Sequence, residues 1–184
     1  SDNTQESRVV AWADWDHDGD LHLAVGNYQQ PNEVFENTGS GFTLAWESPE
    51  VDSTRHLAWG DWNGDGTYAI ATANDSQEAN RVYDLTASTL GSTAAWSTTL
   101  KDNSRSVAWA DWDGDGDLDL AVGNQNQPNR IYNNVNGVLN LAWSSAEQET
   151  TVSVAWGDID GDGDLDLAVG NRNQPNRMYK NTGG

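Results

Sequence analysis

The chain has 184 residues, enough for one sizeable core or two small ones, and its lack of cysteine excludes a disulfide framework and zinc–thiolate sites. The formal net charge is −20, with nine Lys and Arg against 29 Asp and Glu, which argues against a nucleic-acid-binding surface. Ten tryptophans indicate a folded protein, because disordered chains are poor in aromatic residues.

Four internal repeats are anchored by tryptophans at spacings of 47, 50 and 47 residues, each followed two positions later by an aspartate. The anchors are Trp12, Trp59, Trp109 and Trp156. Residues 106–134 and 153–181 agree at 24 of 29 positions. We therefore predict a single domain, residues 1–184, with repeats at about 7–53, 54–103, 104–150 and 151–184.

Each repeat predicts four short antiparallel strands, which the third repeat illustrates. Alternating apolar residues predict strands over 106–110 and 118–123, on either side of an acidic loop. A polar turn leads to a third strand over 130–133, and Asn136-Gly137 predicts a tight hairpin into a fourth strand over 138–143. A second tryptophan series marks the fourth strands, at Trp46, Trp96 and Trp143. This pattern is typical of the four-stranded blades of an all-β propeller.

The strand count leaves the ring incomplete. Repeats one to three have all four strands, but the fourth lacks its final strand, which gives 15 in total. An open propeller would expose apolar faces and an unpaired edge. Three arrangements stay open: a closed four-bladed ring, two copies in an eight-bladed ring, or a fragment of a longer propeller. Self-association or fragment status is favoured over a monomeric ring.

A nine-residue loop after the first strand of every repeat holds 16 of the 21 aspartates. Oxygen ligands at loop positions 1, 3 and 5, a backbone carbonyl at position 7 and a carboxylate at position 9 suit Ca²⁺, which takes 6–8 oxygens. A glycine at position 6 permits the sharp turn around the ion. The third and fourth loops are complete, with Asp111, Asp113, Asp115, Asp117 and Asp119, and with Asp158, Asp160, Asp162, Asp164 and Asp166.

The other two loops are predicted to bind Ca²⁺ less well. The first has His22 at position 9, and imidazole is a poor ligand for this ion. The second has Asn63 at position 3 and Ala69 at position 9. Their remaining candidate ligands are Asp14, Asp16, Asp18 and Asp20, and Asp61, Asp65 and Thr67. We therefore rank the sites 111–119 and 158–166 as strongest, 14–22 as weaker and 61–69 as weakest.

Two rival explanations of the acidic loops fit less well. An EF-hand needs Glu at position 12 and flanking helices, whereas position 12 is Val25, Val122 or Val169 in three of the repeats. Four similar loops lack the contrasting environments that separate the pKa values of a catalytic carboxylate pair. The three histidines accompany no nucleophile motif, so the protein is predicted not to be an enzyme.

The run from Asp111 to Asn124, followed by Gln-Pro-Asn-Arg-Ile-Tyr-Asn-Asn, resembles the FG-GAP/VCBS repeat family, whose relatives include the propeller heads of integrin α subunits. The resemblance covers about residues 7–182. It implies a β-propeller with Ca²⁺ held by the loop residues named above, between the first and second strands of the blades. Ser-Arg or Thr-Arg stands where the namesake Phe-Gly is expected, and four repeats stand where integrin-like heads usually have seven blades.

Repetition without a catalytic constellation predicts a non-catalytic binding or scaffold module in which calcium has a structural role. The resemblance implies glycan or protein ligands, with candidate contacts in the polar turns 29–32, 125–129 and 173–176. The alternative is a self-associating propeller fragment, such as a homodimer forming an eight-bladed ring. No apolar run is long enough for a signal peptide or membrane span, so we expect an extracellular or cell-surface protein whose export signal is absent from these residues.

A final expectation concerns the arginines four residues before the anchor tryptophans. Arg8, Arg55 and Arg105 share the tryptophan face of the first strands, where the fourth repeat has Val152. We expect them to pair with aspartates or bound anions near the ring axis.

Overall fold

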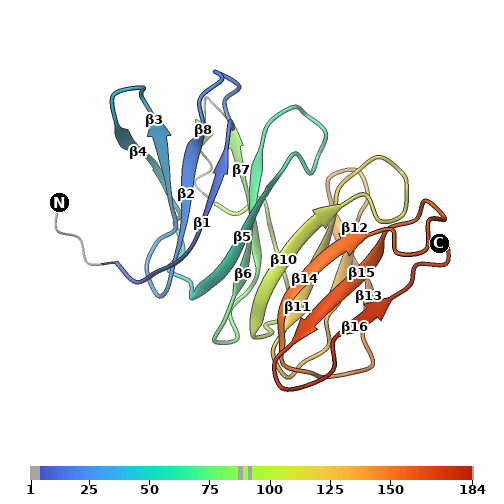
Figure 1. Ribbon diagram of the computed structural model, residues 1–184. Helices are drawn as coiled ribbons and strands as arrows, with labels where there is room; N and C mark the ends of the chain where they lie inside the picture. Colours follow the sequence, from blue (N-terminus) through green and yellow to red (C-terminus); the bar gives the residue numbers. More distant parts are fainter. Residues whose placement is uncertain (1–4, 87–88, 91–92, 184) are drawn as a thin grey trace.

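The computed structural model describes residues 5–86, 89–90 and 93–183, which form four antiparallel sheets side by side (Figure 1). Each sheet consists of consecutive strands, and we call the sheets units one to four. Unit one contains β1 (Ser7–Ala13), β2 (His22–Asn27), β3 (Glu33–Asn37) and β4 (Phe42–Glu47). Unit three contains β10 (Ser104–Ala110), β11 (Asp119–Asn124), β12 (Arg130–Asn134) and β13 (Leu139–Ser144). Unit four has three strands, β14 (Thr151–Gly157), β15 (Asp166–Asn171) and β16 (Arg177–Tyr179).

Unit two differs from the prediction of one continuous fourth strand. It contains β5 (Thr54–Gly60), β6 (Ala69–Asn74) and β7 (Arg81–Thr86), followed by two short outer strands, β8 (Thr89–Leu90) and β9 (Trp96–Ser97). Both outer strands pair with β7, one at each end of it. The described chain therefore has 16 strands. The expected total of 15 was wrong by one, because the outer strand of unit two is divided into β8 and β9. Residues 87–88 and 91–92 lie outside the described part of the chain.

The other predicted features of the sheets agree with the structure. The chain is all-β with antiparallel units, and the last unit lacks a fourth strand within the described residues. Asn136 and Gly137 both have positive φ, 54° and 77°, as the predicted tight hairpin requires. The first strand of unit three begins at Ser104, two residues earlier than predicted, because the strand continues through a register shift between Ser104 and Ser106. Among the described residues, no helix is long and apolar enough to cross a membrane.

The units pack through their innermost strands, which lie next to one another in the order β1, β5, β10, β14. Each anchor tryptophan of units two to four donates its indole N–H to a carbonyl of the preceding unit. The pairs are Trp59 to Ala11 at 3.4 Å, Trp109 to Ala58 at 3.2 Å and Trp156 to Ala108 at 3.1 Å. The second tryptophan series packs edge-on against tyrosines of the following unit, as Trp46 on Tyr83, Trp96 on Tyr132 and Trp143 on Tyr179.

The hydrophobic core therefore lies between units, where neighbouring sheets face each other. One buried cluster joins unit two to unit three and includes Ala71, Val82, Val107 and Leu120. Trp12, which has no preceding unit, keeps 51% of its surface exposed. The closed four-bladed ring is thus not the arrangement of this chain: Figure 1 shows units one and four on opposite sides of an open row.

Candidate metal centres

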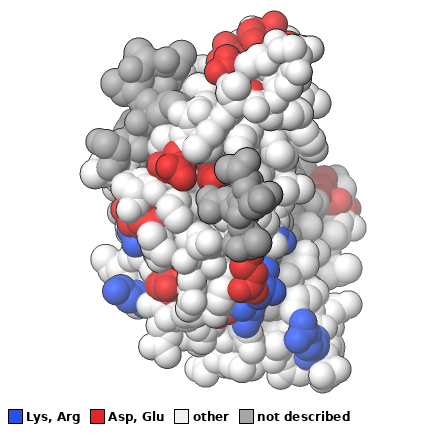
Figure 2. Space-filling model, turned by 90° about the vertical axis from the view of Figure 1, so that its left-hand side faces the viewer, with Lys and Arg blue, Asp and Glu red and all other residues white. Residues whose placement is uncertain are grey.

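All four acidic loops lie at the same end of the molecule, because each follows the innermost strand of its unit and these strands run in the same direction. The loops connect β1 to β2, β5 to β6, β10 to β11 and β14 to β15. Figure 2 views the molecule from the side of unit one and shows an acidic group at the top, with basic side chains confined to the lower half. The loops therefore form an electronegative end that attracts cations.

The aspartate at loop position 1 is held by the backbone of its own loop. One of its carboxylate oxygens accepts the N–H of the residue five positions later. These pairs measure 3.0–3.1 Å and are Asp14 with Gly19, Asp61 with Gly66, Asp111 with Gly116, and Asp158 with Gly163. In the first and second loops the other oxygen, Oδ1, is buried without a hydrogen-bond partner. A buried carboxylate oxygen without a partner is unfavourable, and a bound cation would satisfy it.

The third and fourth loops each bring three carboxylates together, with the nearest oxygens all within 4.8 Å of one another. In the third loop the group is Asp111, Asp113 and Asp115, from positions 1, 3 and 5. In the fourth loop it is Asp158, Asp160 and Asp166, from positions 1, 3 and 9. Predicted ligands Asp119 and Asp162 lie outside these groups, and so do the position-7 residues Asp117 and Asp164, which were predicted to use their backbone carbonyls.

The position-9 carboxylates have a second role, which the sequence analysis missed. Asp119 accepts the backbone N–H groups of Trp112 and Asn134, both at 2.7 Å. Asp166 accepts the equivalent pair, from Ile159 at 3.0 Å and from Asn181 at 2.7 Å. Burial raises the pKa of Asp119 despite these hydrogen bonds. Position 9 thus connects the loop to the end of the third strand through these hydrogen bonds.

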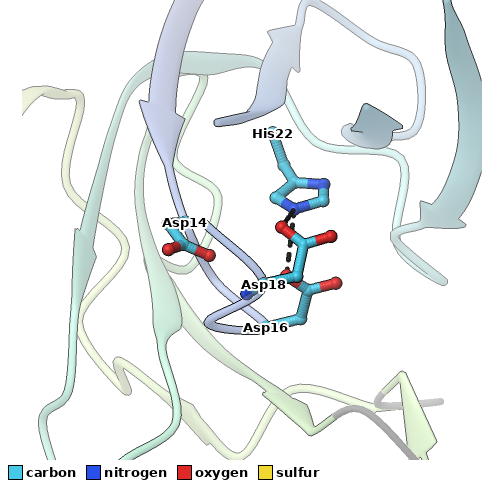
Figure 3. A group of neighbouring side chains, drawn as sticks. All are labelled: Asp14, Asp16, Asp18 and His22. Carbon is cyan, nitrogen blue, oxygen red and sulfur yellow. Dashed lines mark hydrogen bonds and ion pairs between the residues drawn. The ribbon is translucent and has the colours of Figure 1, made fainter. Parts of the chain in front are cut away.

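In the first loop His22 takes the structural place of this carboxylate (Figure 3). Its Nδ1 accepts the N–H of Asn37 at 3.1 Å, so its proton lies on Nε2. Nε2 faces Oδ1 of Asp16 at 3.0 Å and Oδ1 of Asp18 at 3.5 Å. A protonated ring nitrogen cannot bind a metal, so His22 orients the carboxylates and leaves the ligand role to them. Asp14, Asp16 and Asp18 nevertheless converge with His22 within 4.8 Å.

The second loop brings no such group together among the described residues. It has only two carboxylates, Asp61 and Asp65, and the hydroxyl of Thr67 donates to Asp65 at 2.5 Å. This hydrogen bond lowers the pKa of Asp65. Ala69 offers no acceptor at position 9, and the N–H of Leu85 donates instead to the carbonyl of Tyr68 at 3.2 Å.

Two side chains from the third strands also reach the loops. Lys180 places Nζ 2.5 Å from Oδ2 of Asp160, which lowers the pKa of that carboxyl. Asn133, at the equivalent position of unit three, donates to Asp113. The lysine would compete with a cation for Asp160, which predicts a weaker site in the fourth loop than in the third. The sequence signal was the Asn-to-Lys difference between two nearly identical repeats.

The polar turns that were candidate ligand contacts are largely used by the fold itself. In unit three, Oδ1 of Asn129 accepts the N–H of Asn124 at 2.8 Å, and Nδ2 of Asn124 donates to the carbonyl of Pro128 at 2.6 Å. Unit one repeats this pattern with Asn32 and Asn27. Buried amides in such networks are not free to contact a ligand, so an internal structural role is the better explanation of these turns.

The three arginines pair with acidic groups: Arg55 and Arg105 pair with an aspartate, as expected, but Arg8 pairs with a glutamate. Arg55 and Arg105 approach the same carboxylate of Asp75, at 2.7 and 3.1 Å. Arg8 pairs with Glu6. Burial alone would raise the pKa of Asp75, but the Ser76 N–H and these two arginines lower it overall.

Comparison with known proteins adds a family and several similar folds. A family model described as an FG-GAP-like repeat matches residues 14–72, 68–122 and 111–169. Comparison with curated proteins found no match. Two crystal structures of BBS1N in complex with ARL6DN, soaked with lead or mercury, have TM-scores of 0.65 and 0.66 at 14% identity; each match covers 91% of this chain and 52% of BBS1N. The V. cholerae biofilm matrix protein Bap1 matches with a TM-score of 0.60 and 16% identity, over 91% of this chain and 29% of Bap1.

This chain therefore spans about half of BBS1N and less than a third of Bap1. Because the sequence identities are only 14% and 16%, these two similarities are evidence for the fold alone. The three family matches together run from residue 14 to residue 169 and include all four acidic loops, so the chain belongs to the FG-GAP-like repeat family.

Proposed function

We propose that this chain is a non-catalytic β-propeller module that binds Ca²⁺ in its acidic loops and acts as a binding scaffold outside the cell. One observation carries the proposal: in three of the four loops, three carboxylates converge to within 4.8 Å of one another at the same place in the repeat. Membership in the FG-GAP-like repeat family supports the same ion. Carboxylate oxygens are the ligands that Ca²⁺ prefers.

The ion would be held by the three converging carboxylates of each loop, and it would neutralise their repulsion. Pairs of charges at such separations repel by roughly 1–4 kcal/mol at water-like to surface-like dielectric. It would also occupy the place faced by the unpaired Oδ1 of Asp14. We expect dissociation constants on the order of 10⁻⁴ to 10⁻³ M, as in extracellular modules.

The acidic loops are similar to one another and so lack the different environments that a catalytic acid and a catalytic base need. This similarity supports a scaffold role. A protein partner is a better candidate than a glycan, since the amides of the polar turns are engaged in hydrogen bonds within the fold. BBS1N, which has a similar fold, was solved in complex with a protein, ARL6DN.

Thermal unfolding with millimolar Ca²⁺ or with EGTA tests the calcium proposal. One site filled at about ten times its dissociation constant adds about 1.4 kcal/mol of stability, so each such site should raise Tm by roughly 3–6 °C. The double variant Asp113→Ala/Asp160→Ala removes position 3 from the two strongest loops and should lose most of this rise. Asn63→Ala is the matched control, because it truncates the same position in the weakest loop. Superimposable melting curves with Ca²⁺ and EGTA would refute the proposal.

A further inference from the structure

We infer that two copies of this chain associate head to tail, with the free face of unit four of each copy packed on the free face of unit one of the other. This goes beyond the calcium proposal and does not depend on it. The three interfaces between units within the chain define which residues meet when one unit follows another. The two free faces carry the residues of one further interface of the same kind.

Within the chain, a tryptophan of unit three and a valine of unit four each fill a place left by a glycine of the preceding unit. A Cβ added to Gly60 would lie 2.7 Å from the ring of Trp109. A Cβ added to Gly123 would lie 2.8 Å from Cγ1 of Val154. The N–H of Val154 also donates to Oγ of Ser106 at 3.2 Å. These contacts are close enough to exclude a larger residue at either glycine.

Unit one carries the corresponding tryptophan and valine, but no described residue of another unit covers them, and the ring of Trp12 contacts Phe42 of its own unit. Trp12 is 51% exposed and Val10 is 57% exposed. The equivalent valines of units three and four, Val107 and Val154, are only 2% and 6% exposed. A tryptophan and a β-branched residue exposed side by side are unfavourable in water and typical of an interface.

Unit four carries the matching glycines, and they are open. Gly157 is equivalent to Gly60 and has nothing within 4 Å of an added Cβ. Gly170 is equivalent to Gly123 and meets only Ser153 of its own unit. Beside Gly170, a shallow and mainly apolar cavity of about 350 Å³ is lined by residues that include Val154, Ala155 and Ala168. By equivalence, Trp12 of one copy would lie on Gly157 of the other and donate to the carbonyl of Ala155, while Val10 would fill the space at Gly170.

Charges at the edge of the two faces are also complementary. At two interfaces inside the chain, a residue after the second strand forms a β-bridge to the linker before the next unit, as Tyr28 with Ser53 and Gln125 with Thr150. The next pair in this series is Arg172 of unit four with Glu6 before unit one. Within the described residues, the side chain of Arg172 forms no ion pair or hydrogen bond. Opposite charges at this position favour the head-to-tail register.

The nearly identical third and fourth repeats differ mainly where a following unit would lie. Three of their five differences replace Ala110, Trp112 and Gln125 of unit three with Gly157, Ile159 and Arg172. The first change recreates the glycine of the interface between units two and three, and the third provides a second arginine for Glu6, which already pairs with Arg8. The free face of unit four is therefore suited to unit one. The free face of unit four differs from the free face of unit one, so each must pack on the other face of another copy. Two copies are the smallest assembly in which both faces of every chain are covered in this way.

Light scattering during size-exclusion chromatography in Ca²⁺ tests the assembly. The wild-type chain of 20.0 kDa should elute at about twice this mass. Gly157→Leu meets nothing in the single chain and has no positive φ, so it should fold and elute as a monomer. Asn140→Leu is the matched control, since Asn140 is exposed on the outermost strand of unit three, which carries neither free face. A monomeric wild type, or a control that also dissociates, would overturn the inference.

Cross-linking provides a second, independent measurement. The chain has no cysteine, so the double variant Val10→Cys/Gly170→Cys can form disulfides only between these two positions. Oxidation should give a covalent dimer that reduction reverses. Monomers alone, or a ladder of species larger than the dimer, would overturn the closed two-chain ring. Neither readout requires that calcium bind, so failure here and failure of the calcium proposal are distinguishable.

Discussion

The residue at position 9 of each acidic loop determines how the loop is connected to its sheet. Asp119, Asp166 and His22 all accept the backbone N–H at the end of the third strand of their unit. His22 thus preserves the hydrogen bond of the aspartates while removing a negative charge from the cluster. The connection and the ion site are separate functions of one position, and substitutions at His22 can separate them.

Replacing His22 with Asp should raise the Ca²⁺ affinity of the first loop by roughly tenfold, since affinity in such loops depends on ligand charge. An aspartate can still accept the Asn37 N–H, as Asp119 accepts that of Asn134. Replacing His22 with Ala should instead leave a buried N–H without a partner and lower the free energy of unfolding by about 1–3 kcal/mol. Calcium titration and urea unfolding measure the two effects. Equal stability of His22→Ala and wild type in EGTA would show that the hydrogen bond contributes nothing.

The convergence of positions 1 and 3 in the first, third and fourth loops follows the spacing of the aspartates, whereas position 5 converges with them in the first and third loops only. The contacts of Asn133 and Lys180 with the acidic loops could not be predicted from the sequence. They come from the third strand, and only the pairing of β11 with β12 and of β15 with β16 places them beside the loops. The tautomer of His22 was likewise unpredictable, since it depends on the N–H of Asn37, a residue 15 positions away.

At the scale of elements, side-chain acceptors connect neighbouring innermost strands. His56 of β5 accepts the N–H of Val107 in β10 through Nδ1 at 3.4 Å, and Ser106 of β10 accepts that of Val154 in β14. Burial lowers the pKa of His56 below its usual 6.5. Protonation of Nδ1 would also break the bond to Val107, so the interface between units two and three requires the neutral ring.

The stability of the chain should therefore fall as the pH is lowered below about 6.5. In that range the unfolded chain binds a proton at His56 and the folded chain does not, so the free energy of unfolding decreases by at most about 1.4 kcal/mol per pH unit. Urea unfolding in EGTA at several pH values measures the slope. His56→Ser keeps an acceptor, as Ser106 does one unit later, and should flatten the slope. An unchanged slope in this variant would assign the pH dependence to other groups.

The strands were largely predictable, because each repeat has alternating apolar residues between strong turn signals. The exception was the outer strand of unit two. Trp96 marked its end correctly, and it packs on Tyr132 as its equivalents pack on theirs. Two of the three residues that make the second spacing 50 lie between Asn80 and Trp96, however, in the segment where β8 and β9 are separate strands. The sequence located this irregularity without specifying how the strand would divide.

For the molecule as a whole, the repeat places acidic loops and arginines at opposite ends of the innermost strands. The acidic loops gather at one end of the innermost strands, while Arg8, Arg55 and Arg105 lie near the start of these strands at the other. The apolar surface lies between the ends and is covered wherever one unit follows another. Whether the row of units closes could not be predicted from strand counts, because it depends on the curvature of packing between units.

The central claim is that calcium fills the acidic loops in a graded order, and isothermal titration calorimetry tests it most directly. Wild-type protein titrated with CaCl₂ at low ionic strength should bind about two ions first, in the third and fourth loops, and then a weaker ion in the first. Asp113→Ala/Asp160→Ala should lose the first phase, and Asn63→Ala should retain it. Saturable heats with this order are the predicted result, and the absence of saturable heat up to millimolar Ca²⁺ would contradict the account.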